Sequence, residues 1–148
     1  MRKVKFRGKR LDNNKWYYGS YVHIYGTDYD WTGKPIGKTR DMHYIESKDC
    51  VNLAVDKETI GQYIGLEDEN GKSIYEWDIV KVEDTYEEDR PPFVGIVTFR
   101  DCSFIIKTDC TSNYRWMDYE VEVIGNIFDN KDLLEEYDLN LEYIRTEI

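Results

Sequence analysis

The dipeptide Asn70-Gly71 constrains the fold of this 148-residue chain more than any other feature of its sequence. It lies between two apolar segments, at 63–66 and 74–80. Asn and Gly both tolerate the positive φ angles of a tight turn, and this dipeptide between apolar segments is a strong hairpin signal. The sequence therefore predicts a β-hairpin whose turn lies at 68–72.

Glycines and further apolar segments extend this prediction along the chain. Gly61 and Gly65 indicate either a bulge in the first strand of the hairpin or another backbone passing close by, because a strand glycine has no side chain to pack. Residues 4–7 and 16–24 alternate with a period near two around a polar turn, which predicts an opening hairpin. Four later segments have strand character: 79–82, 94–99, 103–107 and 119–124.

We expect a mainly β fold organised as one domain over residues 1–148, because a chain of this length can bury one good core. The strands would form two hairpin-rich β lobes, at 1–66 and 67–128. The close spacing of strands in the second lobe predicts an SH3-like small barrel or a bent sheet.

The C-terminal segment 129–148 is predicted to be helical. Asp129 or Asn130 can cap a helix that runs through Tyr137, because their side chains accept hydrogen bonds from free backbone amides. Apolar residues then continue at helical spacing with acidic residues on the other side, which indicates a face that packs on a partner surface. That partner is either the chain's own core or a sister subunit.

Several segments also carry the motifs of a known family. The stretch Gln62-Tyr63-Ile64-Gly65-Leu66 precedes the turn, and Ile74-Tyr75-Glu76-Trp77-Asp78-Ile79-Val80 follows it. They resemble the YopX family of phage and prophage proteins, whose members typically read Gln-Tyr-Thr-Gly-Leu, an Asp-x-Asn-Gly turn and Ile-Tyr-Glu-Gly-Asp-Ile-Val. Three further regions match the family: 5–20, 94–99 and 121–130. The resemblance implies a mostly β, oligomer-forming protein of a phage or an integrated element, without an established activity.

Two regions depart from the family pattern. Trp77 stands where the family usually has glycine, and a bulky residue in the left-handed conformation would cost roughly 1–2 kcal/mol. Either the backbone differs at this position or the ring recovers that cost by burial. Residues 27–49 match less clearly, and we expect a variable loop there.

Charge is distributed unevenly along the chain. The net charge is −10, but residues 1–40 hold 10 Lys and Arg against 3 Asp and Glu, which leaves −17 on residues 41–148. The basic part could lie against acidic strands of the same or a neighbouring subunit, or it could contact phosphate. The acidic part could mimic a nucleic acid and occupy a host protein.

The basic N-terminal residues and their aromatic neighbours are the candidate nucleic-acid contacts. They are Lys3, Lys5, Arg7, Lys9, Arg10, Trp16 and Tyr17. Alternate residues of a strand share a face, and such a face could neutralise phosphates while aromatic rings stack on bases. A charged edge strand that prevents aggregation has the same pattern, and the overall negative charge opposes non-specific phosphate binding.

No residue pattern predicts catalysis, a cofactor or a metal site. His23 and His43 lie twenty residues apart, and Cys50 after them would need two more ligands to hold zinc. The acidic segment 83–92 lacks the ligand spacing of a calcium loop. Glycine-rich phosphate loops are absent from the sequence. We therefore expect a protein that is not an enzyme and that uses no cofactor or metal.

The cysteines and hydropathy predict a location in the cytoplasm of the bacterial host. Cys50, Cys102 and Cys110 are an odd number, so at least one is unpaired in a monomer, which favours a reducing compartment. A signal-peptide pattern and an apolar run of about 20 residues are both missing, so no membrane association is expected.

We expect a non-enzymatic phage accessory protein that self-associates and binds a host or phage protein. Nucleic-acid binding and nucleic-acid mimicry are the alternatives. The candidate oligomer interface consists of Tyr75, Trp77, Tyr137, Leu141, Ile144 and Ile148, and ordinary core packing is the other interpretation of these residues.

Overall fold

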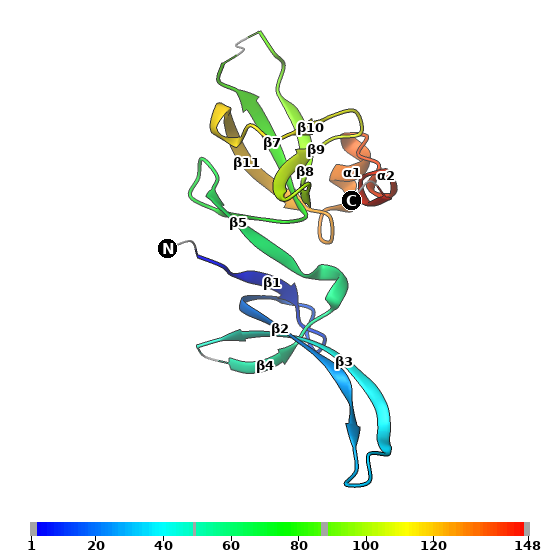
Figure 1. The fold of residues 1–148 in the computed structure, drawn as a ribbon. Helices are drawn as coiled ribbons and strands as arrows, with labels where there is room; N and C mark the ends of the chain where they lie inside the picture. The colour runs from blue at the N-terminus through cyan, green and yellow to red at the C-terminus, as the bar shows by residue number, and fades with distance from the viewer. Residues whose placement is uncertain (1–2, 49, 87–88, 147–148) are drawn as a thin grey trace. The chain divides into compact units, whose positions relative to one another are not determined.

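The computed structural model describes residues 3–48, 50–86 and 89–146 (Figure 1). Its strands all pair in antiparallel fashion, and two short helices lie near the C-terminus. The predicted mainly β fold is therefore confirmed. The chain divides into two units, Lys3–Gln62 and a second that begins at Tyr63, with the boundary inside one strand.

The first unit is a sheet with the neighbour order β4-β3-β2-β1-β5. Its elements are β1 (Phe6–Lys9), β2 (Trp16–Tyr29), β3 (Pro35–Ser47), β4 (Cys50–Ala54), the 3-10 helix η1 (Lys57–Thr59) and the start of β5 (Gly61–Glu67). β1 pairs with β2 from Phe6 opposite Gly19 to Lys9 opposite Trp16, which confirms the predicted opening hairpin.

β2 and β3 form one long hairpin where the sequence predicted a loop over 27–49 (Figure 1). The ladder runs from Ser20 opposite Glu46 to Tyr29 opposite Pro35. At its tip, Asp30 Oδ1 accepts hydrogen bonds from the backbone amides of Thr32 and Lys34. The loop prediction was wrong because most of this ribbon is exposed on both faces, so its sequence lacks the apolar alternation that marks a half-buried strand.

The second unit begins with the hairpin predicted around Asn70-Gly71. The second half of β5 pairs with β6 (Ser73–Tyr75), and the Asp68 amide donates to the Lys72 carbonyl across the turn. Gly71 has a φ of 77°. Gly65 has a φ of 99° where the register shifts between Tyr63 and Glu67, so the predicted bulge is confirmed.

A five-stranded sheet with the order β10-β9-β8-β7-β11 forms the body of the second unit. Its strands are β7 (Asp78–Asp84), β8 (Phe93–Arg100), β9 (Ser103–Lys107), β10 (Ser112–Asn113) and β11 (Tyr119–Asn126), with the 3-10 helix η2 (Trp116–Asp118) before β11. The four predicted strands of this region are all present. The sheet is not closed into a barrel, so the bent-sheet form of the prediction is the one that fits.

Two apolar clusters form the core of the second unit. One contains Ile74, Val80, Val97 and Ile106, and the other packs Ile79 and Ile96 against the C-terminal residues Ile127, Leu139 and Ile144. Alternating residues of β7 and β8 thus enter different clusters, because successive strand side chains point to opposite faces. Both faces of this sheet are covered by apolar contacts.

The C-terminal segment is helical as predicted, but it is not one helix. α1 (Lys131–Glu136) and α2 (Leu141–Thr146) are separated by Asp138, whose φ is 51°. Asn130 occupies the N-cap position of α1, yet its side chain accepts a hydrogen bond from the Asn126 amide instead of a helix amide. The predicted continuous apolar stripe is therefore wrong, because a left-handed residue ends the first helix.

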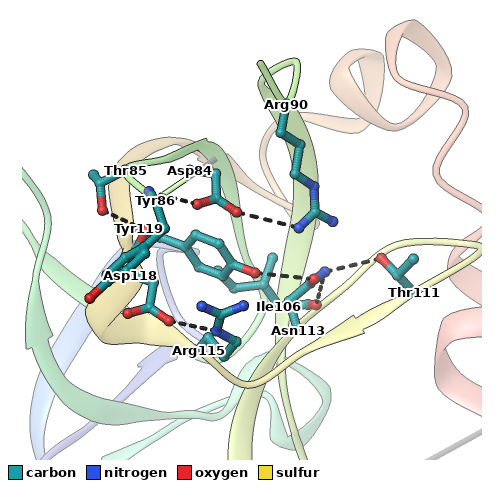
Figure 2. Close-up of polar contacts among 10 residues, drawn as sticks. All are labelled: Asp84, Thr85, Tyr86, Arg90, Ile106, Thr111, Asn113, Arg115, Asp118 and Tyr119. Carbon is teal, nitrogen blue, oxygen red and sulfur yellow. Dashed lines mark hydrogen bonds and ion pairs between the residues drawn. The ribbon is translucent and has the colours of Figure 1, made fainter. Parts of the chain in front are cut away.

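The described part of the acidic segment is anchored to the sheet (Figure 2). Asp84 at the end of β7 is buried, and its Oδ2 lies 3.4 Å from Nη1 of Arg90. The hydroxyl of Thr85 donates to the Asp118 carbonyl, and Arg115 forms an ion pair with the Asp118 carboxylate. The segment between β7 and β8 therefore starts and ends on fixed contacts.

Candidate functional site

Four polar side chains gather on one face of the β2–β3 hairpin. His23 lies directly opposite His43 in the ladder, and Tyr25 lies opposite Asp41. Tyr21 and His23 are two residues apart on β2, as Asp41 and His43 are on β3, so each pair shares a strand face. The register brings together Tyr21, His23, Asp41 and His43, which we call the histidine cluster.

Short polar contacts connect the members of the histidine cluster. Asp41 Oδ1 lies 2.7 Å from Nε2 of His23 and 3.3 Å from Nε2 of His43. The hydroxyl of Tyr21 lies 2.7 Å from Nδ1 of His43. The two imidazole rings stack with centroids 4.3 Å apart and planes 7° apart. One carboxylate is thus shared by two rings, and one of those rings is oriented by a phenol.

Burial and charge affect the members of the cluster differently. The His43 side chain is 14% exposed, whereas His23 and Asp41 lie at the surface. The hydrogen bond from His23 is the main cause that lowers the pKa of Asp41. Burial raises the pKa of Tyr21, and the negative charge of Asp41 raises it further. Asp41 therefore remains a carboxylate, and Tyr21 remains a neutral phenol, over the physiological pH range.

A cavity of about 200 Å³ adjoins the cluster. Its lining includes Asp41 and His43 from β3 together with Leu11, Val55 and Lys57. Lys57 Nζ lies 4.0 Å from Oδ2 of Asp41, whereas the imidazole contacts are made to Oδ1. The histidine cluster itself contains two imidazole nitrogens and a carboxylate, and both ligand types bind transition metals.

Sequence reasoning did not find this cluster. His23 and His43 lie twenty residues apart without a neighbouring Cys or His at metal-ligand spacing, and the loop expected over residues 27–49 gave no pairing that would bring them together. The turn at Asp30–Lys34 is a signal for the hairpin, but a regular ladder closed by it would place residue 23 opposite residue 41. The register shift between Gly26 and Asp28 brings residue 23 opposite residue 43 instead, and nothing in the sequence pattern marks that shift.

The structure does not leave the basic N-terminal residues as one exposed face. Arg7 and Lys9 are only 5% and 8% exposed. The Arg7 guanidinium lies 4.6 Å from the Trp16 ring centroid, and Lys9 Nζ lies 5.4 Å from it. Arg10 pairs with Asp12 and also lies over the Tyr17 ring. Of the predicted contacts, Lys3 is exposed and Lys5 is half-buried.

The predicted oligomer-interface residues fall into different environments. Tyr75 and Ile144 are buried within the second unit, as the core-packing interpretation has it. Trp77 and Leu141 are half-buried against the cluster that contains Ile144, and Tyr137 is exposed. Ile148 lies outside the described residues.

Exposed apolar side chains are instead concentrated on the outer part of the β2–β3 hairpin. Trp31 at the tip is 97% exposed. Four further exposed residues lie on the two strands: Ile24, Tyr25, Tyr29 and Ile36. We call residues 24–40 the arm. Its aromatic composition was not recognised from the sequence, again because a loop was expected there.

Trp77 has a φ of 70°, so it has the left-handed backbone that favours glycine. Its amide donates to the Val97 carbonyl, and its own carbonyl accepts from the Ile127 amide. The ring packs on the cluster of Ile79 and Ile127, and the Arg145 guanidinium lies 5.5 Å from its centroid. Ring packing therefore offsets the backbone strain at this position.

In the described residues, no helix is both long and apolar enough to cross a membrane. The fold is similar to the crystal structure of protein EF1440 from Enterococcus faecalis, with a TM-score of 0.50 and 20% sequence identity. The similarity covers 90% of this chain and 99% of that one, and at this identity it concerns the fold alone. A comparison with curated proteins found no match. The family model described as YopX protein matches residues 5–135, and the chain therefore belongs to the YopX family.

Proposed function

We propose that this protein is a non-enzymatic accessory protein of a phage or prophage that self-associates through the arm of the β2–β3 hairpin. The main support is the exposure of Trp31, Tyr25 and Tyr29 on one projecting ribbon. Tyr and Trp are enriched at protein interfaces because they bury a large apolar area with little conformational freedom. The arm is the part of the first unit where such residues gather.

The strand edges of the arm support a partner that adds to the sheet. β1 pairs with β2 only at Trp16–Gly19, and β4 pairs with β3 only at Tyr44–Ser47. Within the described residues, no strand pairs with the outer edges of β2 and β3 over the arm. A two-stranded ribbon is marginally stable in water, and unpaired edges are templates for another strand. A partner strand on the arm would pair a free edge of the ribbon and would also stabilise it.

Charge supports a second copy of the chain as that partner. The acidic residues of the arm, Asp28 and Asp30, lie in or directly after β2, whereas the basic residues Lys34, Lys38 and Arg40 lie directly before or in β3. A two-fold pairing of like edges would bring like charges together, whereas a head-to-tail interface pairs one edge with the other. The β2 edge of one arm paired with the β3 edge of another would bring acidic residues of one chain near basic residues of the other.

The test is the mass of the particle in solution. The wild-type protein at micromolar concentration should sediment as a dimer or a larger oligomer. The double change Tyr29→Ser with Trp31→Ser should yield a monomer, because it removes exposed rings without touching the core. Tyr86→Ser is the matched control, since this ring is exposed in the second unit and should leave the mass unchanged. A monomeric wild-type protein would exclude the proposal.

An acidic surface on the second unit supports a second function, the binding of a basic partner. Glu83 on β7 lies opposite Glu120 on β11, and a hollow of about 190 Å³ beside them is also lined by Glu69, Glu122 and Lys81, which forms an ion pair with Glu83. This surface supports the mimicry of a nucleic acid toward a host protein. Immobilised wild-type protein should retain a basic host protein at moderate salt, and the double change Glu120→Lys with Glu122→Lys should release it. Equal retention by both proteins would contradict this function.

A further inference from the structure

We propose that His23, Asp41 and His43 form a binding site for a divalent transition-metal ion such as zinc. The potential ligand atoms of these three residues all lie within 4.8 Å of one another. The site lies on paired strands, and backbone register rather than loop conformation sets the positions of its ligands.

The separations of the donor atoms suit a small metal ion. With zinc bonds of 2.0–2.1 Å, neighbouring ligands of a tetrahedral site lie about 3.3 Å apart. The Asp41 carboxylate oxygen lies 2.7 Å from His23 Nε2 and 3.3 Å from His43 Nε2. These two separations are therefore close to those of a tetrahedral site even before the rings reorient. Two imidazoles and a carboxylate are a donor set that zinc accepts in proteins.

Tyr21 supports the metal-binding form of His43. Ligation through Nε2 requires a neutral imidazole with its proton on Nδ1, and a partner at Nδ1 selects that tautomer. The Tyr21 hydroxyl oxygen lies 2.7 Å from Nδ1 and can accept a hydrogen bond from the Nδ1–H group. His43 Nε2 is buried and makes no hydrogen bond, although it lies 3.3 Å from Asp41. A metal ion would give this nitrogen the partner that it lacks.

Metal binding requires the stacked imidazole rings of the cluster to reorient. The two rings are nearly parallel, so their Nε2 lone pairs cannot point at one centre until the rings turn out of the stack. His23 and Asp41 are exposed enough to rotate, whereas His43 is held by Tyr21. Three protein ligands leave a fourth position that faces solvent. This open position would be taken by water or by a ligand from a binding partner.

Because the chain has two histidines and both belong to the proposed site, their NMR signals can report zinc binding directly. Zinc should be titrated into the full-length protein after its thiols are alkylated, because three cysteines would otherwise compete for the metal. Calorimetry should show one ion per chain, and imidazole proton resonances of both histidines should shift together in NMR spectra. Shifts of one histidine alone, or no saturable heat, would overturn the proposal.

Variants separate this site from adventitious binding. His23→Ala and Asp41→Asn should each abolish the one-to-one binding, and Tyr21→Phe should weaken it about 10- to 100-fold, as removal of an outer partner does at other metal sites. Asp28→Asn is the matched control, because this carboxylate lies on the same hairpin outside the cluster. Unchanged zinc affinity in Asp41→Asn, with both histidine resonances still present in a folded spectrum, would refute the site.

Discussion

The two units of this protein are both antiparallel β structures, but they are stabilised in different ways. In the second unit, apolar side chains from β7, β8, β9 and β11 fill two buried clusters. In the described part of the first unit, the buried apolar side chains are Ile45 and Val55. Arg7 and Lys9 are also buried in this unit, and both lie over the Trp16 ring. A chain can therefore build one unit on apolar burial and another on strand pairing and cation–aromatic contacts.

The magnitudes of these contacts explain why the units suit different tasks. Burial of one large aliphatic side chain is worth about 1.5–3 kcal/mol, and the second unit has many of them. A cation–π contact contributes about 0.5–2 kcal/mol, depending on how far it is desolvated. The first unit gains less from burial and leaves polar and aromatic groups on its surface. That surface carries the arm and the histidine cluster, whereas the second unit has the larger core.

The largest predicted effect tests the core of the second unit. Ile106→Ala should lower the free energy of unfolding by about 2–5 kcal/mol, because this fully buried side chain leaves a cavity in a packed cluster. Urea denaturation measures the change. Ile36→Ala, at an exposed position of the arm, should change stability by at most about 0.5 kcal/mol. Equal losses of unfolding free energy in the two variants would contradict the claim that apolar burial stabilises the second unit more than the arm.

The next effect tests strand packing in the first unit. A Cβ at Gly19 would lie 1.9 Å from the Glu46 carbonyl oxygen, so Gly19→Ala must push β2 and β3 apart. We expect a loss of about 1–3 kcal/mol, as in other overpacked sites. The loss should be measured as faster hydrogen exchange of the backbone amides of β1, β2 and β3 in Gly19→Ala than in the wild-type protein.

Gly26→Ala is the matched control for that experiment. No atom lies within 4 Å of a Cβ built at Gly26, which is on the same strand. This change should leave exchange rates in β1–β3 nearly unaltered. Faster exchange in both variants would mean that loss of glycine, and not the contact with Glu46, destabilises the hairpin.

Asp68 provides a pH-dependent comparison. Its Oδ1 accepts from the amides of Asn70 and Lys72, and its Oδ2 accepts from the Val123 amide. Burial opposes ionisation, but these amides outweigh it and lower the pKa of Asp68. Asp68→Asn should cost about 1–3 kcal/mol at neutral pH, because an amide cannot accept at both positions.

The sign of the pH dependence follows from the lowered pKa. The stabilisation by Asp68 should be complete above the unfolded carboxyl value of about 3.9 and should be lost as the pH falls through the lower folded value. Stability curves of wild type and Asp68→Asn should therefore converge in acid. Asp30 in the first unit also accepts amides at a turn, but it is half-buried whereas Asp68 is buried, so Asp30→Asn should have a smaller effect. Parallel curves for Asp68→Asn would contradict this account.

The smallest effect isolates backbone strain at Trp77. Trp77→Ala and Trp77→Gly both remove the ring, but only glycine tolerates the φ of 70° without strain. The glycine variant should therefore be the more stable of the two by about 1–2 kcal/mol in thermal or urea unfolding. At Trp31, where φ is not positive, glycine should bring no gain over alanine. A similar gain at both sites would exclude strain as the cause.

Local rules predicted much of the second unit. Asn70-Gly71 located its turn, Gly65 located its bulge, and apolar segments located β7, β8, β9 and β11. These features follow from φ preferences and from the period of two in strands that bury one face or both. The same rules failed for residues 27–48, because a ribbon exposed on both faces has no apolar period to detect.

The sequence by itself determined the strand-forming segments, the turn chemistry and the resemblance to the YopX family, and it left open whether Trp77 has a left-handed backbone. The structure gives Trp77 a φ of 70°. Tertiary structure decided which side chains meet. His23, Asp41 and His43 come together because the β2–β3 register pairs residues twenty apart, and Arg7 and Lys9 are buried because the neighbouring strand places Trp16 beside them. Registers depend on turns and on neighbouring strands together, so contacts across a sheet are not contained in the local pattern of either strand.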